Sequence, residues 1–512
     1  LLSIFSFNLS ASHFVGGEIT WECNTDPLSV DYGKYTFFLT IYQDCDGIDF
    51  SSSYDITVHN HPSLSSINLP LISTSDISPT GVASSVPCYN CDNQPFGGFG
   101  AVKQWSYVSS PITIIGTPPA NGWHFTWGSC CRSGAIVNIP TPDSEDWTVR
   151  SVMYPYTDPN GNVFPNGNLC HDNSPIFKEE PKSILCTGYP FSYSHLAFDV
   201  ELDSLSYSWA EPLDDNFNYN PANPSASALT YSPPYTVNSP IPGNPTLNNE
   251  NGEISFLSFT SGVFVTVIKV EAFKCGQLVA EVFRDVNVAL LGCGTLPNGA
   301  QNLPPVITAP LGPQDWITNL NISTGLPSYE TTIMAGELVS FSVVATDNDI
   351  NTTGNLQGLS LEVEGGQLDP AYALSNPATF TVISSTPGNI SGDFLWQSNC
   401  DHMQDYGCGR QGGAFTFNMK AYDDFCPANG IVIATITINV IPPRPDLRCL
   451  AVDSIGGVEL SFVFPEGVVD TNIKYDIYHS KQFAGNYILL DSVYYPETNY
   501  LHINSNANTS QS

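Results

Sequence analysis

The stretch VFVTVIKVEAFKCGQLVAEVFRDVNVAL at residues 263–290 recurs in outline as FTFNMKAYDDFCPANGIVIATITINVIP at residues 415–442. Each copy has an alternating strand, then alanine and an aromatic residue, then a turn with one cysteine and one glycine, then a second alternating strand. Alternation predicts half-buried β-strands, and a unit repeated in series indicates a modular chain. We therefore expect an all-β protein built from β-sandwiches arranged in line.

The segments upstream of the two copies also match each other. In residues 190–209 and 338–363, an Ala-x-Asp motif follows a strand, acidic residues come next, and a Leu-Ser pair opens the following strand. The 40 glycines and 40 prolines fit frequent turns between short strands, and we find no long stretch with helical periodicity. The repeat therefore covers most of a sandwich rather than one hairpin.

Composition limits the partners that the chain can have. It carries 15 Lys+Arg against 49 Asp+Glu, a formal charge of −34. Such a field repels phosphate backbones, so we expect no nucleic-acid partner. No internal run approaches the roughly 18 apolar residues that a spanning helix needs, so we expect no membrane-spanning segment.

Two features predict export. The first eleven residues, LLSIFSFNLSA, resemble the apolar region and cleavage site of a secretory signal, although a buried first strand is an alternative. The 14 cysteines are an even number, which fits disulfides in an oxidising compartment. Connectivity does not follow from sequence, but proximity favours Cys170–Cys186, Cys275–Cys293 and one bridge among Cys400, Cys408 and Cys426.

A set of motifs in order resembles one family. The motifs are SHFVGGEITWEC (12–23), YQDCDG (42–47), CCR (130–132) and NSPIF (173–177). Over residues 12–295 the chain is similar to the amino-terminal region of large exported surface proteins of Bacteroidota. Those proteins commonly end in a gliding-motility-associated domain, the sorting signal for type IX secretion. The chain differs at residues 198–203, FDVELD, where relatives carry an Asp-Pro-Asp-Gly-Asp turn.

The resemblance implies a secreted or cell-surface, adhesin-like protein with a binding or structural role. Its partners would be an extracellular glycan or protein ligand and the secretion machinery, and the role would be linked to gliding or surface attachment. Weaker cadherin-like and fibronectin-like similarity covers the remaining residues. The fold class is therefore all-β, as tandem Ig-like/cadherin-like β-sandwiches.

Turn signals and linkers divide the chain into six predicted segments. They are a residual signal peptide (1–11), an amino-terminal β-sandwich (12–140), a linker or long edge loop (141–175), an Ig/PKD-like sandwich (176–294), a cadherin-like sandwich (302–442) and a partial fibronectin type III-like domain (443–512). The fibronectin type III-like assignment rests on predicted strands such as GVELSFVF and IKYDIYHS.

Four aspartates of the third sandwich form the best candidate site. Asp347 and Asp349 follow one strand, and Asp423 and Asp424 end a later one. Calcium takes six to eight hard oxygens, which clustered carboxylates and turn carbonyls supply, and cadherin-like repeats place such pairs at a pole between domains. We expect calcium here, although the aspartates could simply cap turns.

The second sandwich departs from this pattern. Asp199 aligns with Asp347 and Glu201 with Asp349, but Phe273 and Lys274 stand where Asp423 and Asp424 would be. A lysine removes a ligand and adds a competing charge. We therefore expect the second sandwich not to bind calcium.

Other candidate sites are weaker. Cys88-x-x-Cys91 with Cys130-Cys131 could bind zinc, but disulfides fit an exported protein better. The cluster of Trp105, Trp123, Trp127 and Trp147 could stack on sugars, but sandwiches normally bury tryptophan, which favours a core.

No sequence pattern selects a catalytic centre. Serine-hydrolase elbows and phosphate-binding loops are absent, and no pair of carboxylates is singled out for glycoside hydrolysis. We predict that the chain is not an enzyme. The alternatives are accessory modules of a larger secreted enzyme, for example a polysaccharide-degrading one, or a structural spacer without a ligand.

Overall fold

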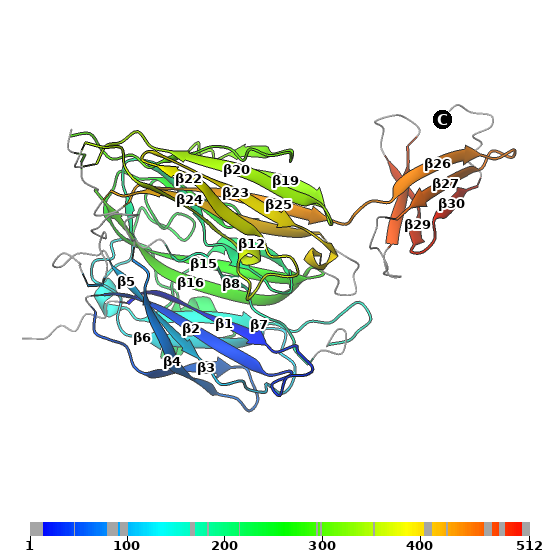
Figure 1. Cartoon of the computed structure of the whole chain (residues 1–512). Coiled ribbons are helices and arrows are strands. Elements are labelled where there is room, and N and C mark those ends of the chain that lie inside the picture. Colours follow the sequence, from blue (N-terminus) through cyan, green and yellow to red (C-terminus); the bar gives the residue numbers. More distant parts are fainter. Residues whose placement is uncertain are drawn as a thin grey trace, which may run out of the picture.

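The computed structural model describes residues 14–45, 47–78, 91–92, 101–163, 169–181, 184–214, 216–292, 295–296, 299–351, 354–403, 412–425, 429–464, 474–480 and 487–503. Within these residues the chain folds into strands β1 to β30, joined by short 3-10 turns. This confirms the all-β prediction (Figure 1). No described helix has the length and apolar character needed to cross a bilayer.

The third unit is a sandwich of two sheets, with strand orders β17-β20-β23-β22 and β18-β19-β25-β24-β21. The strands of the first sheet are β17 (Val306–Ile307), β20 (Leu338–Thr346), β22 (Thr379–Thr386) and β23 (Asn389–Gln397). Those of the second are β18 (Ile317–Leu320), β19 (Pro327–Met334), β21 (Leu359–Glu364), β24 (Gly413–Asp423) and β25 (Ile431–Ile441). Alternate residues of β20 are buried, so one face of each sheet packs on a core around Trp396 and Phe417.

The second unit has the same topology. Its strands are β8 (Ile176–Phe177), β9 (Ile184–Cys186), β10 (Pro190–Ser194), β11 (Ala197–Phe198), β12 (Ser204–Trp209), β13 (Thr246–Leu247), β14 (Glu253–Leu257), β15 (Gly262–Lys274) and β16 (Gln277–Leu291). The order β10-β14-β13 matches β20-β23-β22, and β16-β15-β12 matches β25-β24-β21. In both units an early short strand pairs in parallel with the last long one, β9 with β16 and β19 with β25. The repeat seen in the sequence is therefore a repeat of the fold.

The first unit is not a separate sandwich. Its strands are β1 (Phe14–Cys23), β2 (Tyr35–Asp44), β3 (Ser53–His59), β4 (Ser66–Asp76), β5 (Val102–Val108), β6 (Trp123–Ser129) and β7 (Trp147–Met153). They form the order β1-β2-β5-β4-β3-β6-β7, and both end strands then pair with β16 of the second unit. The sheet thus closes into a barrel-like ring that shares a strand with its neighbour. At Gly16 a Cβ would meet the backbone of Asp285, so glycine permits the approach of β1 to β16.

The predicted boundaries of the first unit are therefore wrong. The linker or loop placed at 141–175 contains β7, whose residues pair with β6 on one side and with β16 on the other. The Asp, Asn, Pro and Gly residues on both sides of β7 concealed this buried strand. The sandwich placed at 12–140 consequently lacks one of its own strands.

The first three units lie side by side rather than in line, as the stacked layers of Figure 1 show. Phe198 of the second unit packs in the core of the third, and Ile433 of the third packs in the core of the second. Between them Glu179 is 1% exposed. Lys420 Nζ lies 3.3 Å from Glu179 Oε1, and Asn418 Nδ2 donates to Glu179 Oε2. A buried charged contact of this kind fixes how two units dock, so the predicted in-line arrangement is wrong here.

The last unit stands apart from the other three (Figure 1). It has two small sheets, β26-β27-β30 and β28-β29. The strands are β26 (Asp446–Val452), β27 (Val458–Val463), β28 (Lys474–His479), β29 (Ile488–Tyr494) and β30 (Asn499–His502). Every residue of β26 is exposed. The assignment of residues 443–512 to a partial fibronectin type III-like domain stays a prediction.

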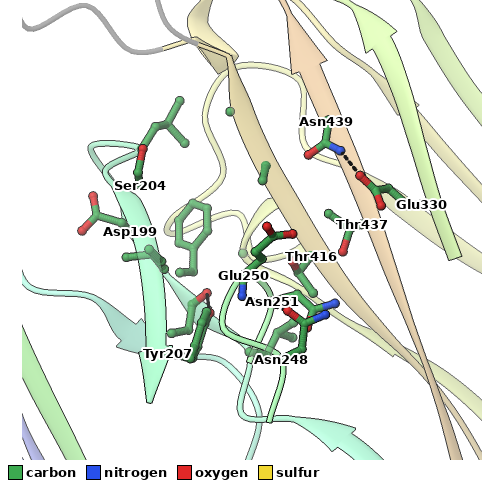
Figure 2. Close-up of a pocket in the computed structure, with 18 of the residues that line it drawn as sticks. Asp199, Ser204, Tyr207, Asn248, Glu250, Asn251, Glu330, Thr416, Thr437 and Asn439 are labelled. Atoms are coloured by element: carbon green, nitrogen blue, oxygen red, sulfur yellow. Dashed lines mark hydrogen bonds between the residues drawn. The ribbon is translucent and has the colours of Figure 1, made fainter. Parts of the chain in front are cut away.

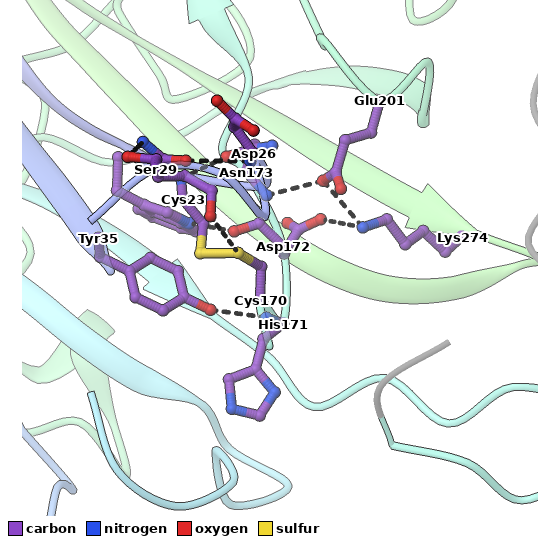
Figure 3. Close-up of a disulfide and its surroundings, with 12 residues drawn as sticks. Cys23, Asp26, Ser29, Tyr35, Cys170, His171, Asp172, Asn173, Glu201 and Lys274 are labelled. Carbon is purple, nitrogen blue, oxygen red and sulfur yellow. Dashed lines mark hydrogen bonds and ion pairs between the residues drawn. A yellow bond between two sulfur atoms is a disulfide. The ribbon is translucent and has the colours of Figure 1, made fainter. Parts of the chain in front are cut away.

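The disulfides differ from those that proximity favoured. Cys170 is bonded to Cys23, across a sequence separation of 147, so the predicted Cys170–Cys186 bridge is wrong (Figure 3). The end of β1 and the segment after Cys170 lie together, because Cys23 N donates to Asn173 Oδ1 and Trp21 N donates to Ser174 Oγ.

Two more bridges, Cys45–Cys91 and Cys130–Cys131, engage three of the four thiols that the zinc alternative required. Cys186 and Cys275 are also disulfide-bonded. The remaining predicted partners Cys293, Cys408 and Cys426, together with Cys88 and the predicted signal peptide at 1–11, lie outside the described residues.

Candidate functional site

The four predicted aspartates gather at one end of the third unit, where the chain enters it. Asp349 N donates to Asp347 Oδ1 at 2.8 Å, and Leu303 N donates to Asp349 Oδ2 at 2.8 Å. Asn302 Nδ2 donates to Asp423 Oδ2 at 2.7 Å. The segment that enters the unit is therefore held by both pairs of aspartates.

Asp423 lies at the centre of this hydrogen-bonded group. Its Oδ1 accepts from the backbone N–H groups of Phe425 and Gly430, at 3.0 and 2.8 Å. Burial raises the pKa of Asp423 to about 7, against the opposing effect of the donors from Asn302 and the backbone. Burial likewise raises the pKa of Asp347 to about 6. Among the described residues, no cationic side chain contributes to the pKa of either carboxyl.

Two oxygens at this end meet no donor among the described residues. Asp347 Oδ2 and Gln357 Oε1 are buried and accept no hydrogen bond from that part of the chain. Gln357 is tied into the group because its Nε2 donates to Asn302 Oδ1 at 2.7 Å. Unpaired buried oxygens cost free energy unless a donor or a cation meets them. The donor set, made of carboxylate and amide oxygens, fits a hard cation such as calcium.

The four carboxylates do not close around one point by themselves. In the described residues, the groups of three His, Cys, Asp or Glu side chains with ligand atoms within 4.8 Å do not include them. A cation at this end would therefore need the amide oxygen of Gln357 and further ligands beside Asp347.

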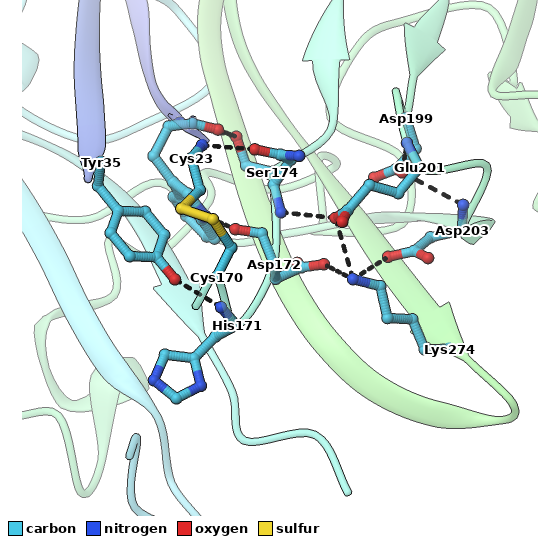
Figure 4. A network of polar contacts seen from close by, with 12 residues as sticks. Cys23, Tyr35, Cys170, His171, Asp172, Ser174, Asp199, Glu201, Asp203 and Lys274 are labelled. Atoms are coloured by element: carbon cyan, nitrogen blue, oxygen red, sulfur yellow. Dashed lines mark hydrogen bonds and ion pairs between the residues drawn. A yellow bond between two sulfur atoms is a disulfide. The ribbon is translucent and has the colours of Figure 1, made fainter. Parts of the chain in front are cut away.

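The corresponding end of the second unit holds a lysine instead (Figure 4). Lys274 Nζ lies 2.6 Å from Asp172 Oδ1, 2.9 Å from Glu201 Oε2 and 3.9 Å from Asp203 Oδ2. The lysine is 2% exposed, and Asp172 is fully buried. An ammonium group thus occupies the centre of three carboxylates.

The two ends share their hydrogen-bonding pattern. Asn173 N donates to Glu201 Oε2 at 2.8 Å, as Leu303 N donates to Asp349. The buried pair Asn302–Asp423 has its counterpart in Asp172–Lys274. In the third unit the carboxylate of this pair, Asp423, lies at the strand end. In the second unit the carboxylate, Asp172, lies on the entering segment, and the strand end carries Lys274. The second unit therefore contains its own cation.

The strand register corrects the sequence alignment by one residue. Leu205 faces Ala272 in the second unit, and Leu361 faces Ala421 in the third. Counting from these alanines, Lys274 corresponds to Asp423 rather than Asp424. The two turns differ in length, so the sequence match across them was one residue out of register.

Electrostatics keep Lys274 charged. Although burial opposes its charge, Asp172, Glu201 and Asp203 raise the pKa of Lys274 well above its usual value. Burial also opposes the charge on Glu201, but Lys274 and the N–H of Asn173 hold the pKa of Glu201 below its usual range. Burial raises the pKa of Asp172 and of Asp203 well above the usual range. The ammonium of Lys274 therefore stabilises the ionised form of Glu201, while burial opposes the ionised forms of Asp172 and Asp203.

Sequence reasoning missed the residues of the entering segments that contact Lys274 and Asp423. Asp172 and Asn302 stand at the same place in HDNSP and QNLPP, four positions before the first strand of each unit. In both segments a proline precedes the first short strand of the unit. A comparison of the two segments could therefore have identified Asp172 and Asn302.

The tryptophan cluster is core. Trp105, Trp123, Trp127 and Trp147 are 4%, 1%, 3% and 0% exposed. They pack inside the ring of the first unit, so the sugar-stacking idea for these residues is wrong and the core interpretation is confirmed.

Replacement of the lysine tests this account. Lys274→Met leaves Asp172 and Glu201 buried without a cation, and we expect the free energy of unfolding to fall by about 3–5 kcal/mol without calcium. Because the emptied cluster is an oxygen site, millimolar calcium should restore more stability in the variant than in the parent protein. Guanidinium unfolding with and without calcium measures both effects.

Lys269→Met is the matched control, since Lys269 pairs with Glu271 and Glu281 but is 23% exposed in its side chain. It should lose about 1 kcal/mol or less and gain no calcium response. A Lys274→Met protein that calcium stabilises no more than its parent would show that the lysine does not replace a metal ion.

Comparisons with known proteins give weak likenesses. No protein-family model and no curated protein matches the chain. Titin domains A168–A170 are 12% identical, with 64% of this chain and 88% of that chain covered and a TM-score of 0.17. Cadherin-like domains 1 to 4 of zebrafish RET are 10% identical (69% and 67% covered, TM-score 0.15). The D1–D4 fragment of ICAM-5 is 10% identical (93% and 98% covered, TM-score 0.17). Because these TM-scores are low, the fold is assigned from the strands and sheets of the structure and not from these likenesses.

Proposed function

We propose that this chain is a non-catalytic, extracellular binding protein of the adhesin type, whose third unit binds calcium. The observation that carries the proposal is the comparison of two equivalent ends, here called poles. They are the cluster around Lys274 in the second unit and the group around Asp347 and Asp423 in the third. One pole encloses the ammonium of Lys274, and the other leaves Asp347 Oδ2 and Gln357 Oε1 without a donor in the part of the chain that the structure describes. A cation supplied by the medium would complete the second pole as Lys274 completes the first.

The extracellular location is supported by the disulfides. Bridges such as Cys23–Cys170 and Cys45–Cys91 persist in oxidising compartments, where calcium is also abundant. The formal charge of −34 favours ligands other than nucleic acid. In keeping with the sequence resemblance, the protein would be exported by a secretion machinery to a bacterial surface and serve attachment or gliding.

A rigid platform suits such a role. The first three units are joined by a shared strand and by buried charges such as Glu179 with Lys420. Calcium at the third pole would fix the segment at Asn302 and Leu303 that connects the second unit to the third. The platform would then present its surfaces to a ligand without losing conformational entropy on binding.

Calcium titration tests the metal proposal. We expect the full chain to bind calcium with a dissociation constant of about 10⁻⁴–10⁻³ M, as extracellular modules do. Affinity should be weaker at pH 5.5 than at pH 8, because protons compete where the pKa of Asp347 is about 6 and that of Asp423 about 7. Isothermal titration calorimetry and thermal unfolding report both.

Asp347→Asn should abolish this heat, whereas Asp446→Asn on the exposed strand β26 should leave it unchanged. Absence of heat and of a thermal shift at millimolar calcium in the parent protein would refute the metal proposal.

Adhesion tests the functional class. We expect the labelled full chain to be retained on cells or on surfaces coated with polysaccharide or protein, and a calcium chelator to reduce retention several-fold. An acidic protein of similar size and charge serves as the control. Retention no greater than that of the control on every surface would count against an adhesive role.

A further inference from the structure

A cavity of about 400 Å³ lies where the second unit meets the third (Figure 2). The second unit contributes β12 and the loop from Asn248 to Asn251, and the third contributes residues of β19, β24 and β25. The volume falls within the range of about 300–1,000 Å³ that is usual for small-molecule sites. Its position depends on the side-by-side docking of the two units.

The lining is polar and carries no cationic side chain. Amides, hydroxyls and carboxylates face the cavity from both units, and none of the described residues that line it is Lys, Arg or His. An anionic ligand would therefore find no charge partner. An apolar ligand would strip water from the amides without replacing their hydrogen bonds, which is costly.

The side from the second unit presents donors. Asn248 Oδ1 accepts from Glu250 N at 2.8 Å, and Asn251 Oδ1 accepts from Glu253 N at 3.0 Å. These bonds fix both side chains and leave their NH₂ groups to donate.

The side from the third unit presents acceptors. Asn439 Nδ2 donates to Glu330 Oε1 at 2.7 Å, which leaves Asn439 Oδ1 and Glu330 Oε2 to accept. Asn319 Nδ2 reaches Glu330 Oε2 only at the long distance of 3.5 Å. Amide donors of the loop and acceptors of the third unit thus both line the cavity, together with the carboxylates that the second unit contributes.

The carboxylate of Asp199 lies behind the cavity wall. Asp199 is 3% exposed, and its Oδ1 accepts from the N–H groups of Glu201 and Asp203. Its Oδ2 is buried and accepts no hydrogen bond from the described residues. Because this oxygen is buried, Asp199 makes the wall unfavourable for an anion rather than contacting a ligand directly.

Aromatic side chains complete the lining. Phe198, Tyr207 and Tyr329 are each at most 9% exposed and form apolar parts of the wall. A sugar ring has hydroxyls that both donate and accept at its edge and C–H groups on its faces. This combination of groups matches the cavity.

We propose that this cavity binds an uncharged oligosaccharide end, held by the two asparagines of the loop on one side and by Asn439, Thr416 and Thr437 on the other. The inference rests on the proposed binding function and names the ligand class and the place. Neutral rather than acidic or sulfated glycans are selected, because the lining supplies hydrogen bonds without positive charge.

The test is a glycan array probed with the labelled full chain, with neutral, acidic and sulfated oligosaccharides side by side. We expect retention of neutral glycans only. The best neutral hit is then titrated against the parent protein and against Thr416→Val/Thr437→Val. These threonines face each other on β24 and β25, and valine keeps their shape and strand preference. The double variant should bind at least tenfold more weakly with an unchanged unfolding midpoint.

Thr381→Val on the exposed strand β22 is the matched control and should bind as the parent does. A blank neutral panel, retention of acidic glycans alone, or equal affinity of the double variant would each overturn the inference. Because protein-coated surfaces are included in the adhesion assay above, retention there together with a blank array would leave the proposed function standing and remove only this site.

Discussion

Strand β16 connects four strands from two units. Along Gln277–Leu291 it pairs with β15 over its full length, with β7 and β1 of the first unit, and with the short β9. Most of its residues are buried, so both faces of the strand lie inside protein. Two adjacent charged residues in the strand each find a partner. Arg284 Nη2 lies 2.9 Å from Glu18 Oε1, and Asp285 Oδ2 lies 2.8 Å from Arg132 Nη2. Adjacent residues of a strand point to opposite faces, so these ion pairs hold β16 from both sides.

The second and third units share a fold, but the charge of their carboxylate clusters is compensated in different ways. In the second unit a buried ammonium meets the carboxylates that gather where the chain enters. In the third unit the equivalent position carries Asp423, whose pKa burial raises to about 7. In the second unit the ammonium of Lys274 compensates the carboxylates, so this pole requires no cation from the medium. An aspartate gives a pole whose stability depends on protons, and under the proposal above calcium would take the place that Lys274 has in the second unit.

Sequence patterns predicted local structure well because alternation and turn chemistry are local. The repeated hairpins, the convergence of Asp347 with Asp423, and the replacement of an aspartate by Lys274 all followed from residue types at matched positions. Alternation assigns the faces of a strand but not its neighbours, so the pairing of β7 and β1 with β16 could not be predicted. The apolar run VALL at residues 288–291 was a signal of burial on two faces at the end of this strand. Cys23–Cys170 and the cavity between the units depend on contacts between distant segments, which spacing in the sequence does not report.

Native-state hydrogen exchange followed by mass spectrometry, at increasing guanidinium concentrations, tests most directly whether the first two units form one body around β16. If they do, amides of β1, β7 and β16 will share a single free energy of opening and will become exposed in the same step. If peptides from β1 to β7 exchange in an earlier and separate step while β15 and β16 stay protected, the shared strand does not join the two units and the account is wrong.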